Sequence, residues 1–247
     1  MLDAADCEIQ GASVPLADGA VFVDGSLHEG YGLGLDTDLQ RRNWLACGGN
    51  GCEGCCRMAL PSGQMWGAVF ITFGPPIEPP RPALDVRTFS GLAFELRAES
   101  EGQSVQVGVK DACDPDDGTE TKLAIDAIPT TWTSYEFSLD QFAGADLSAL
   151  YVVLEFVFDA NEGGTEPEQT TFFRNVRFVA ATCGDVDGDG AITEVDAVLV
   201  LRAGVLLPGE CPLNRCDRNG DGAITDVDGV NALRAAALLS HQSTCPL

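Results

Sequence analysis

A twelve-residue acidic segment occurs twice near the C-terminus, and it constrains the fold of this chain more than any other feature. Residues 185–196 read DVDGDGAITEVD, and residues 217–228 read DRNGDGAITDVD. Both copies place oxygen-bearing side chains at positions 1, 3, 5, 9 and 12, with glycine at position 6. Calcium takes six to eight oxygen ligands, and this spacing lets one short loop wrap around the ion. The duplication therefore predicts two calcium-binding loops.

The predicted ligands follow from the position of each residue in its loop. They are Asp185, Asp187, Asp189, the backbone carbonyl of Ala191, Thr193 and Asp196 in the first loop, and Asp217, Asn219, Asp221, the carbonyl of Ala223, Thr225 and Asp228 in the second. Gly190 and Gly222 supply the sharp turn that a residue with a Cβ atom would resist. Acidic surface turns are the alternative, because Asp-Gly is common turn chemistry. Two copies in the same register favour calcium.

The segments that flank the loops depart from an ordinary EF-hand. Position 12 carries Asp where the full motif has Glu, so the reach of this ligand is shorter. Residues 180–184 and 212–216 precede the loops and have neither the length nor the periodicity of a helix. Residues 195–203 and 227–239 follow the loops with apolar residues at helical spacing. Each repeat is predicted to be a loop followed by a helix, without an entering helix.

The tail from Cys183 to Leu247 resembles a type I dockerin, a calcium-dependent module that docks onto cohesin domains. The resemblance implies a cohesin-like partner and a partner-binding surface at positions 10 and 11 of the loops, with one arginine on each helix. These residues are Glu194, Val195, Arg202, Asp226, Val227 and Arg234. For the two arginines, surface solvation or a local ion pair is the alternative. Because the two halves are alike, the resemblance also implies a near-twofold surface that binds in two orientations.

The charge of the chain limits its partners. The 247 residues include 14 Lys and Arg against 38 Asp and Glu, which gives a formal net charge of −24. Such a charge disfavours electrostatic binding to nucleic acid or to an anionic membrane surface. No segment is typical of a membrane-inserted helix. Residues 2–6 are acidic rather than typical of a secretory signal, which we interpret as a mature or recombinant form.

Ten cysteines favour an extracellular protein, either secreted or at a cell surface. The first part of the chain contains Cys7, Cys47, Cys52, Cys55, Cys56 and Cys113, and the tail contains Cys183, Cys211, Cys216 and Cys245. An even number in each part favours disulfides within each part. A Cys183–Cys245 bridge would join the ends of the tail, and a Cys211–Cys216 bridge would close the connection between the repeats. The connectivity of the first part stays open.

The cysteine cluster at residues 47–56 allows two interpretations. Its first three cysteines have the C-x₄-C-x₂-C spacing of a plant-type iron–sulfur loop, and zinc is a further alternative. Against a metal, Cys113 is distant in the sequence and the chain has only two histidines. A disulfide-bonded loop is therefore the favoured prediction.

Residues 21–179 show the alternation of apolar and polar side chains that is typical of β-strands. Candidate strands are residues 68–73, 92–97, 105–109, 134–139, 152–158 and 171–178, and clusters of Pro, Gly and Asp separate them. Many strands with few helical segments predict an antiparallel β-sandwich. We therefore expect a mainly β fold, with a jelly-roll sandwich over residues 1–180 and a small α-helical calcium-binding domain over residues 181–247.

The order of these strands resembles that of the jelly-roll carbohydrate-binding modules. The cues are Trp66-Gly67 at the start of a strand, the segments 89–94, 105–109 and 132–139, and a last strand at 172–178. The resemblance implies binding of a polysaccharide or surface glycan on aromatic faces. Trp44, Trp66 and Tyr31 are the candidates, and burial in the core is the alternative for each.

Two further predictions concern the first part of the chain. Trp132 is expected in the core, because it precedes an alternating strand. The resemblance also implies a third calcium ion near Asp24 and Asn175. Arg174 stands where an acidic residue is common in the family, which counts against that third ion.

Catalysis has little support in the sequence. Only His28 and His241 are present, and no nucleophile elbow or Ser-His-Asp motif is evident. A carboxylate pair could hydrolyse glycosides, but among 38 acidic residues a pair is uninformative. The favoured prediction is a non-catalytic extracellular protein that binds glycan and assembles with a protein partner. The alternatives are a self-assembling fibre or matrix subunit whose tail packs on a neighbouring subunit, and a polysaccharide-active enzyme component.

Overall fold

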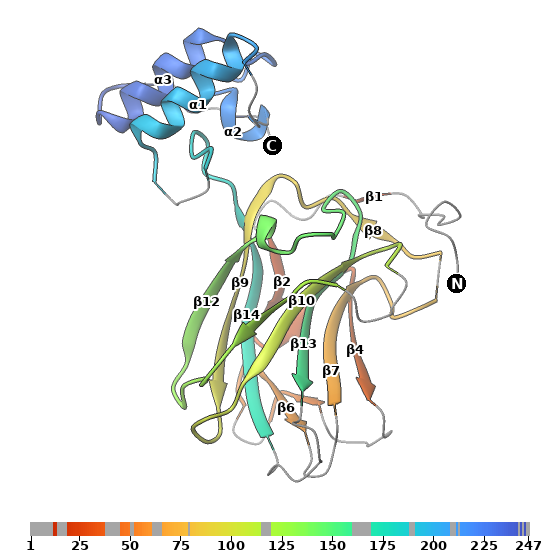
Figure 1. Ribbon diagram of the computed structural model, residues 1–247. Helices are drawn as coiled ribbons and strands as arrows, with labels where there is room; N and C mark the ends of the chain where they lie inside the picture. Colours follow the sequence, from red (N-terminus) through yellow and green to blue (C-terminus); the bar gives the residue numbers. More distant parts are fainter. Residues whose placement is uncertain are drawn as a thin grey trace. The chain divides into compact units, whose positions relative to one another are not determined.

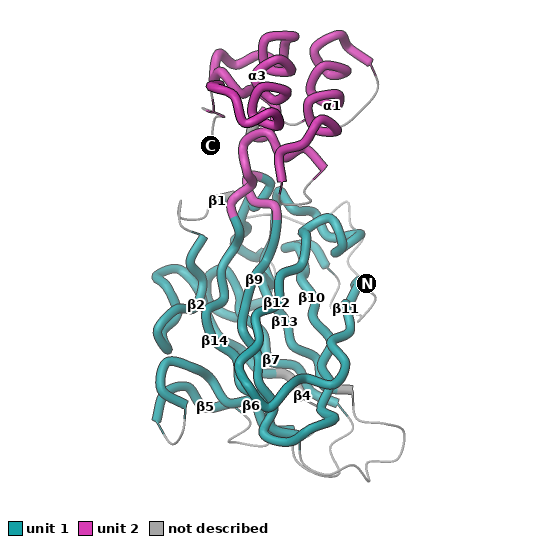
Figure 2. Tube along the Cα trace, turned by 90° about the vertical axis from the view of Figure 1, so that its left-hand side faces the viewer, with its two compact units in different colours: residues 1–87, 91–179 teal, residues 88–90, 180–247 magenta. Residues whose placement is uncertain are grey.

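The computed structural model describes residues 12–13, 19–37, 45–49, 52–60, 66–78, 80–114, 120–159, 169–187, 191–207, 211, 213–241, 243 and 245. The chain divides into two compact units, one of residues 1–87 and 91–179 and the other of residues 88–90 and 180–247 (Figure 2). The described part of the first unit consists mainly of strands and loops, and that of the second consists mainly of helices and loops.

Two sheets face each other in the first unit (Figure 1). The described strands of the first sheet are β1 (Ala12–Ser13), β4 (Tyr31–Thr37), β7 (Trp66–Phe73), β8 (Ala83–Leu84), β10 (Val105–Asp111), β11 (Lys122–Ile125) and β13 (Leu150–Asp159). Those of the second are β2 (Ala20–Val23), β3 (Ser26–Leu27), β5 (Leu45–Cys47), β6 (Cys56–Leu60), β9 (Phe89–Ala98), β12 (Thr133–Ser138) and β14 (Gln169–Ala180). A short 3₁₀ helix, η2 (Leu139–Gln141), follows β12. The predicted mainly β, jelly-roll sandwich is confirmed.

Strand pairing places β13 at the centre of the first sheet. It pairs with β7 on one side and with β10 on the other, and all these pairings are antiparallel. The sheet continues from β7 to β4 and from β10 to β11, again in antiparallel register. Among the described strands, the short pair β1–β8 is parallel. Five strands that are distant in the sequence therefore form one continuous surface.

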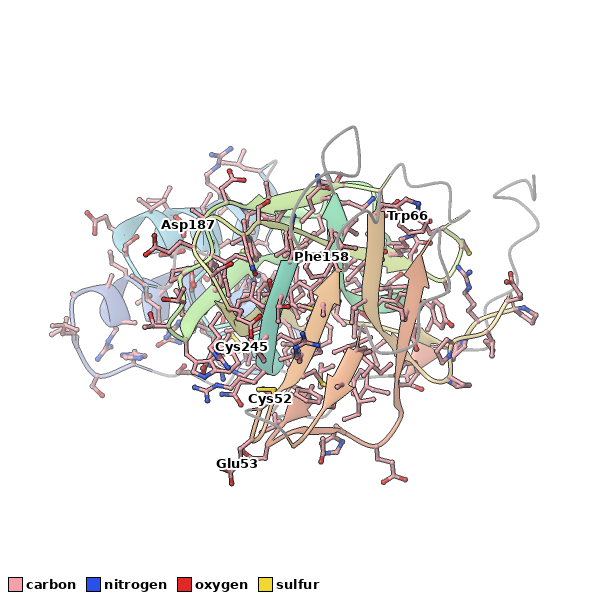
Figure 3. The ribbon with its side chains drawn as sticks, turned by 90° about the horizontal axis from the view of Figure 1, so that it is seen from below. Cys52, Glu53, Trp66, Phe158, Asp187 and Cys245 are labelled. Atoms are coloured by element: carbon pink, nitrogen blue, oxygen red, sulfur yellow. A yellow bond between two sulfur atoms is a disulfide. The ribbon has the colours of Figure 1, made fainter. Side chains whose placement is uncertain are left out.

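The core lies between the two sheets because alternate side chains of each strand point inward. Leu154, Phe156 and Phe158 of β13 are at most 1% exposed, and Figure 3 shows Phe158 in the interior of the sandwich. Phe156 meets Phe94 of β9 edge-on at 5.2 Å between ring centroids and Phe173 of β14 at 5.3 Å. Burying each phenylalanine contributes about 1.5–3 kcal/mol, so this cluster holds the sheets together.

The second unit contains α1 (Glu194–Gly204), α2 (Leu213–Cys216) and α3 (Asp226–Ala236). The helices predicted after the loops are α1 and α3. The second of them ends at Ala236 instead of residue 239, because the chain turns at Leu238, where φ is 55°. One helical turn, α2, precedes the second loop, where no helix was predicted. None of the described helices is long and apolar enough to cross a membrane.

Helices α1 and α3 pack closely because a small residue stands at their contact. A Cβ atom at Gly229 of α3 would lie 2.4 Å from the side chain of Leu201 on α1. The core of this unit contains Val200, Ala232 and Cys216, which are completely buried, together with other small apolar residues. The second unit thus buries only a small apolar core, and such cores usually depend on disulfides or metals.

The described cysteines are joined in disulfides. The bridges are Cys47–Cys56, Cys52–Cys55, Cys183–Cys245 and Cys211–Cys216. Cys113 is also disulfide-bonded, and Cys7 lies outside the described residues. The two bridges of the tail are the pairs considered from the sequence. In the cluster at residues 47–56 all four sulfur atoms are bonded to one another in pairs, which leaves no thiolate there for a metal.

Candidate functional site

The first calcium loop brings three carboxylates together. Asp185, Asp187 and Asp196 each have a carboxylate oxygen within 4.8 Å of the others. Asp185 and Asp196 are buried, whereas Asp187, which Figure 3 labels, is exposed. Calcium binds oxygen at 2.3–2.6 Å, so oxygens on one ion lie within about 5 Å of each other. The three carboxylates fit one calcium ion. The fourth predicted carboxylate of this loop, Asp189, lies outside the described residues.

Asp196 both closes the first loop and begins α1. One carboxylate oxygen accepts hydrogen bonds from the backbone N–H of Val186 at 2.7 Å and of Asp187 at 3.2 Å. The other accepts from the backbone N–H of Thr193 at 2.8 Å, which forms a capping box with the N-cap residue of α1. Burial alone would raise the pKa of Asp196, but these hydrogen bonds lower it below its usual value. A shorter Asp at position 12 suits this double role.

The second loop also contains two buried carboxylates. Asp217 is completely buried and accepts hydrogen bonds from the backbone N–H groups of Gly220 at 2.8 Å and Gly222 at 2.7 Å. Asp228, also completely buried, accepts from the backbone N–H of Asn219 at 3.1 Å. The remaining predicted ligands, Asp221, Ala223 and Thr225, lie on the same loop and are exposed or half-buried. The loop is therefore shaped around inward-pointing acidic side chains.

A buried arginine, which the sequence analysis missed, stands at the second loop. Arg218 is completely buried, and its guanidinium donates to the carbonyl of Cys183. Gly184 makes room for it, because a Cβ atom there would overlap the guanidinium, and φ at Gly184 is +100°. Burial lowers the pKa of Arg218, while the charges of Asp228 and Asp196 oppose this effect. The sequence carried one local sign of this role: Arg218 is a charged residue at position 2 of the second loop, where the first loop has the apolar Val186.

The residues of the predicted partner surface lie on the exposed faces of α1 and α3. Val195 is 53% exposed and Val227 is 51% exposed, although both are apolar. One helical turn later, Val198 and Val230 are 53% and 50% exposed. Glu194, Arg202, Asp226 and Arg234 are also exposed. Equal exposure at equivalent positions gives the two helices similar outer faces, each with a row of unburied valines.

The first sheet carries a groove of about 650 Å³ on the side away from the core. One row of directly paired residues crosses its five strands from β4 to β11, namely Gly34, Phe70, Glu155, Gly108 and Lys122. Neighbouring strands lie about 4.8 Å apart, so this row is roughly 19 Å long. The remaining lining includes Leu35, Trp66, Ala68, Ile77, Glu78, Arg81, Lys110, Glu120, Tyr151 and Val157.

Two glycines in this row leave space on the sheet. A Cβ atom at Gly34 would lie 2.1 Å from the ring of Phe70, so the ring lies flat over Gly34. A Cβ atom at Gly108 would stand 3.4 Å from Oε2 of Glu155 and would narrow the space beside this oxygen. The Phe70 ring therefore fills the position beside Gly34, whereas the absence of a side chain at Gly108 leaves room on the sheet beside Glu155.

Two lysines and two glutamates form the polar part of the groove. The Lys122 ammonium lies 2.6 Å from Glu120 Oε1, and the Lys110 ammonium lies 3.3 Å from the same oxygen. Lys110 also lies 4.0 Å from Glu155 Oε1. Burial would raise the pKa of Glu120, but the hydrogen bond from Lys122 and the two lysine charges lower it below its usual value. Glu120 is therefore ionised at neutral pH.

Glu155 differs from Glu120 in its surroundings. It is only 6% exposed, and its Oε2 has no hydrogen-bond partner among the described residues. Burial raises the pKa of Glu155 to about 7, with the charge of Lys110 opposing the rise and that of Glu120 adding to it. The sequence carried one local signal of this residue, a single acidic side chain in the otherwise apolar segment LYVVLEFVF of β13.

The predicted glycan-binding residues have different surroundings. Trp66 lines the groove and is 38% exposed. Tyr31 packs edge-on against Phe73 at 5.9 Å and is not part of the described lining. Trp44 lies outside the described residues. Trp132 is half-buried against the Cys52–Cys55 disulfide, so the expectation of a core position is met only in part.

The surroundings of Asp24 and Asn175 do not favour a third calcium ion. The side-chain amide of Asn175 donates to Glu95 at 2.8 Å, and Arg174 forms an ion pair with the same carboxylate at 2.7 Å. The guanidinium of Arg174 places a positive charge beside the hollow that these residues line. Glu53 lines the same hollow, but among the described residues no three His, Cys, Asp or Glu side chains converge there. The third ion stays an implication of the resemblance alone.

Replacing Glu155 is expected to stabilise the first unit at alkaline pH. The folded-state pKa of about 7 exceeds the ordinary value of 4.5, so the folded state holds this proton more tightly. Stability therefore falls as pH rises between these values, and at about pH 8 Glu155→Gln should unfold with a free energy about 1–3 kcal/mol higher than the parent chain. All three tryptophans lie in the first unit, so urea unfolding followed by tryptophan fluorescence reports this effect.

The exposed residue Glu101 provides the control, because Glu101→Gln should leave the pH dependence unchanged. If Glu155→Gln and the parent chain lose stability equally between pH 5 and pH 8, Glu155 does not carry a raised pKa.

The second unit contains two acidic loops, each followed by a helix. Residues 183–231 match the family model described as dockerin type I domain. This match confirms the resemblance inferred from the duplicated loop. No curated protein matches the chain.

Solved structures similar to the first unit are carbohydrate-binding modules. A family 30 module matches with 17% identity and a TM-score of 0.46, over 67% of this chain and 100% of that chain. A family 11 module from Clostridium thermocellum, in complex with a β-1,3-1,4-mixed-linked tetrasaccharide, matches with 12% identity and a TM-score of 0.42, over 64% of this chain and 93% of that chain. A family 29 module matches with 16% identity and a TM-score of 0.38, over 64% of this chain and 88% of that chain. These TM-scores are below 0.5. The topology of the sandwich is established by its strand pairings alone.

Proposed function

We propose that this chain is a non-catalytic extracellular adaptor. Its dockerin-type region docks onto a cohesin-like domain when calcium is bound, and its β-sandwich binds a polysaccharide in the groove of the first sheet. The observations that carry the proposal are the three converging carboxylates of the first loop and the buried Asp217 and Asp228 of the second, within the residues that match the dockerin type I model. The disulfides support an extracellular setting.

Calcium supplies positive charge that the loops lack. The first ion would be held by Asp185, Asp187 and Asp196, and the second by Asp217 and Asp228 together with the other predicted ligands. Several carboxylates in one short loop repel each other, so two ions would fix both loops and the helices that begin in them. The exposed valines of α1 and α3 would then be presented in one geometry to the partner.

The groove has features that suit a polysaccharide. Trp66 and the ring of Phe70 offer apolar faces, while the lysines and glutamates offer hydrogen-bonding groups. The carboxylates of Glu120 and Glu155 share one ammonium group, that of Lys110, at 3.3 and 4.0 Å.

Trp66→Ala is expected to weaken polysaccharide binding about tenfold, because it removes an aromatic face from the groove. Affinity electrophoresis of the whole chain in gels with mixed-linked β-glucan, glucomannan or xylan measures this effect. Trp132→Phe provides the control, because Trp132 is not part of the groove lining. If none of these polysaccharides retards the parent chain, the glycan-binding part of the proposal is wrong.

A further inference from the structure

We propose that Glu155 determines ligand class and pH dependence in the groove, where it accepts hydrogen bonds from hydroxyl groups of a neutral polysaccharide while it is ionised. This inference rests on the proposed polysaccharide-binding function of the same groove. It adds the chemical class of the ligand and a control of binding by protons.

The position of Glu155 calls for a hydrogen-bond donor from outside the protein. Glu155 lines the groove, and its buried Oε2 accepts no hydrogen bond from a described residue; the protonated form of Glu155 can share its proton with the neighbouring Glu120, whereas the ionised form cannot. A buried acceptor without a partner costs about 1–3 kcal/mol, and more when it is charged. Two residues flank Glu155 in the cross-strand row. Phe70 has no hydrogen-bond donor in its side chain, and Gly108 has no side chain at all. A ligand hydroxyl above Gly108 would approach this oxygen where β10 has no side chain, and contact with the buried oxygen would need a shift of the flexible Lys122 side chain beside it.

The charges of the groove favour a neutral ligand. The acidic groups of the lining are Glu78, Glu120 and Glu155, and the basic groups are Arg81, Lys110 and Lys122. With all six ionised the charges balance, so neither a polyanion nor a polycation gains net attraction there. The carboxylate of Glu155 would repel an acidic sugar, and the two lysines would repel an amino sugar. Hydroxyl groups donate hydrogen bonds without carrying charge, and carbon faces of sugar rings can lie on Trp66 and Phe70.

The groups that face Glu155 come from three elements of the groove. Lys110 lies on β10, Lys122 lies on β11, and Glu120 precedes β11. Tyr151 of β13 and Arg81 line the same groove, and neither histidine is part of its described lining. Burial raises the pKa of Glu155 to about 7. Because hydroxyl donors favour the ionised carboxylate, we expect the affinity for a neutral polysaccharide to fall about tenfold from pH 8 to pH 6.

Isothermal titration of the whole chain with soluble mixed-linked β-glucan tests this inference. The dissociation constant should rise about tenfold between pH 8 and pH 6, and about half a proton should be released per ligand bound at pH 7. Proton release is obtained from titrations in buffers with different ionisation enthalpies. Polygalacturonate and chitosan oligosaccharides serve as acidic and cationic probes, and both should bind more weakly than the neutral glucan.

Glu155→Gln keeps the shape of the side chain but cannot ionise. It should weaken glucan binding about tenfold at pH 8 and remove the pH dependence, while Glu101→Gln should bind like the parent chain. Three results would overturn the inference: unchanged glucan binding by Glu155→Gln, pH-independent glucan binding by the parent chain, or tighter binding of either charged probe than of the glucan. Each of these results would leave the proposed polysaccharide binding itself intact. If the parent chain binds none of the neutral polysaccharides, the proposed function itself is wrong. Should Glu155→Gln fail to fold, proton release by the parent chain still decides the question.

Discussion

A double variant, Asp185→Ala with Asp217→Ala, is expected to lose calcium uptake, the calcium-dependent helical structure of the second unit and binding to a cohesin domain. Each substitution removes the first ligand of one loop, and both side chains are at most 4% exposed. Asp217→Ala also leaves the backbone N–H groups of Gly220 and Gly222 without their acceptor. We expect cohesin affinity to fall at least about a hundredfold, because binding free energy of structural metals is coupled to folding.

Titration calorimetry with calcium chloride and far-ultraviolet circular dichroism measure uptake and helix content. Glu194→Ala is the matched control, because Glu194 lies within the first loop and is exposed but is not a predicted ligand. This control should bind calcium like the parent chain. If the double variant still binds two calcium ions with unchanged affinity, the assignment of the loops is wrong.

The second largest effect is expected from loss of the Cys183–Cys245 bridge, which should lower the free energy of unfolding of the second unit. This disulfide joins residues 62 positions apart, whereas Cys211–Cys216 joins residues 5 positions apart. The loop-entropy model gives about 4 kcal/mol for the longer loop and about 2 kcal/mol for the shorter one. We therefore expect Cys183→Ala with Cys245→Ala to lower the free energy of unfolding of the second unit by about 4 kcal/mol.

Urea unfolding followed by circular dichroism of the helices measures this loss, because the described helices lie mainly in the second unit. The pair Cys211→Ala with Cys216→Ala serves as the comparison, with a loss of about half that size. Equal losses for the two pairs would show that the constraint on the unfolded chain is not what stabilises this unit.

The acidic loops and the helices that follow them could be predicted because their information is local. All predicted ligands of one ion lie within twelve consecutive residues, and the helices are capped by Thr193 and Thr225, whose capping partners Asp196 and Asp228 belong to the same loops. The second copy doubled the evidence. Arg218 could not be predicted, because its acceptor, Cys183, is 35 residues away in the sequence.

The groove could not be predicted because it depends on strand register. Gly34, Phe70, Glu155, Gly108 and Lys122 become neighbours only when five strands pair in an order that differs from their order in the sequence. Aromatic residues alone were a weaker guide, since Trp66 lines the groove and Tyr31 does not. A single glutamate in an apolar strand was the one local sign of this surface.

The two proposed sites make the chain a link between a polysaccharide and a protein, and co-sedimentation tests this claim most directly. A labelled type I cohesin domain is mixed with an insoluble form of a polysaccharide that the chain binds, with or without the chain, in calcium or in excess chelator. We predict that the cohesin domain sediments only when both the chain and calcium are present. In chelator, the chain should still sediment while the cohesin domain stays in solution. A chain that sediments in calcium without the cohesin domain, or that sediments without any polysaccharide, would contradict the account, and the latter result would instead show self-assembly.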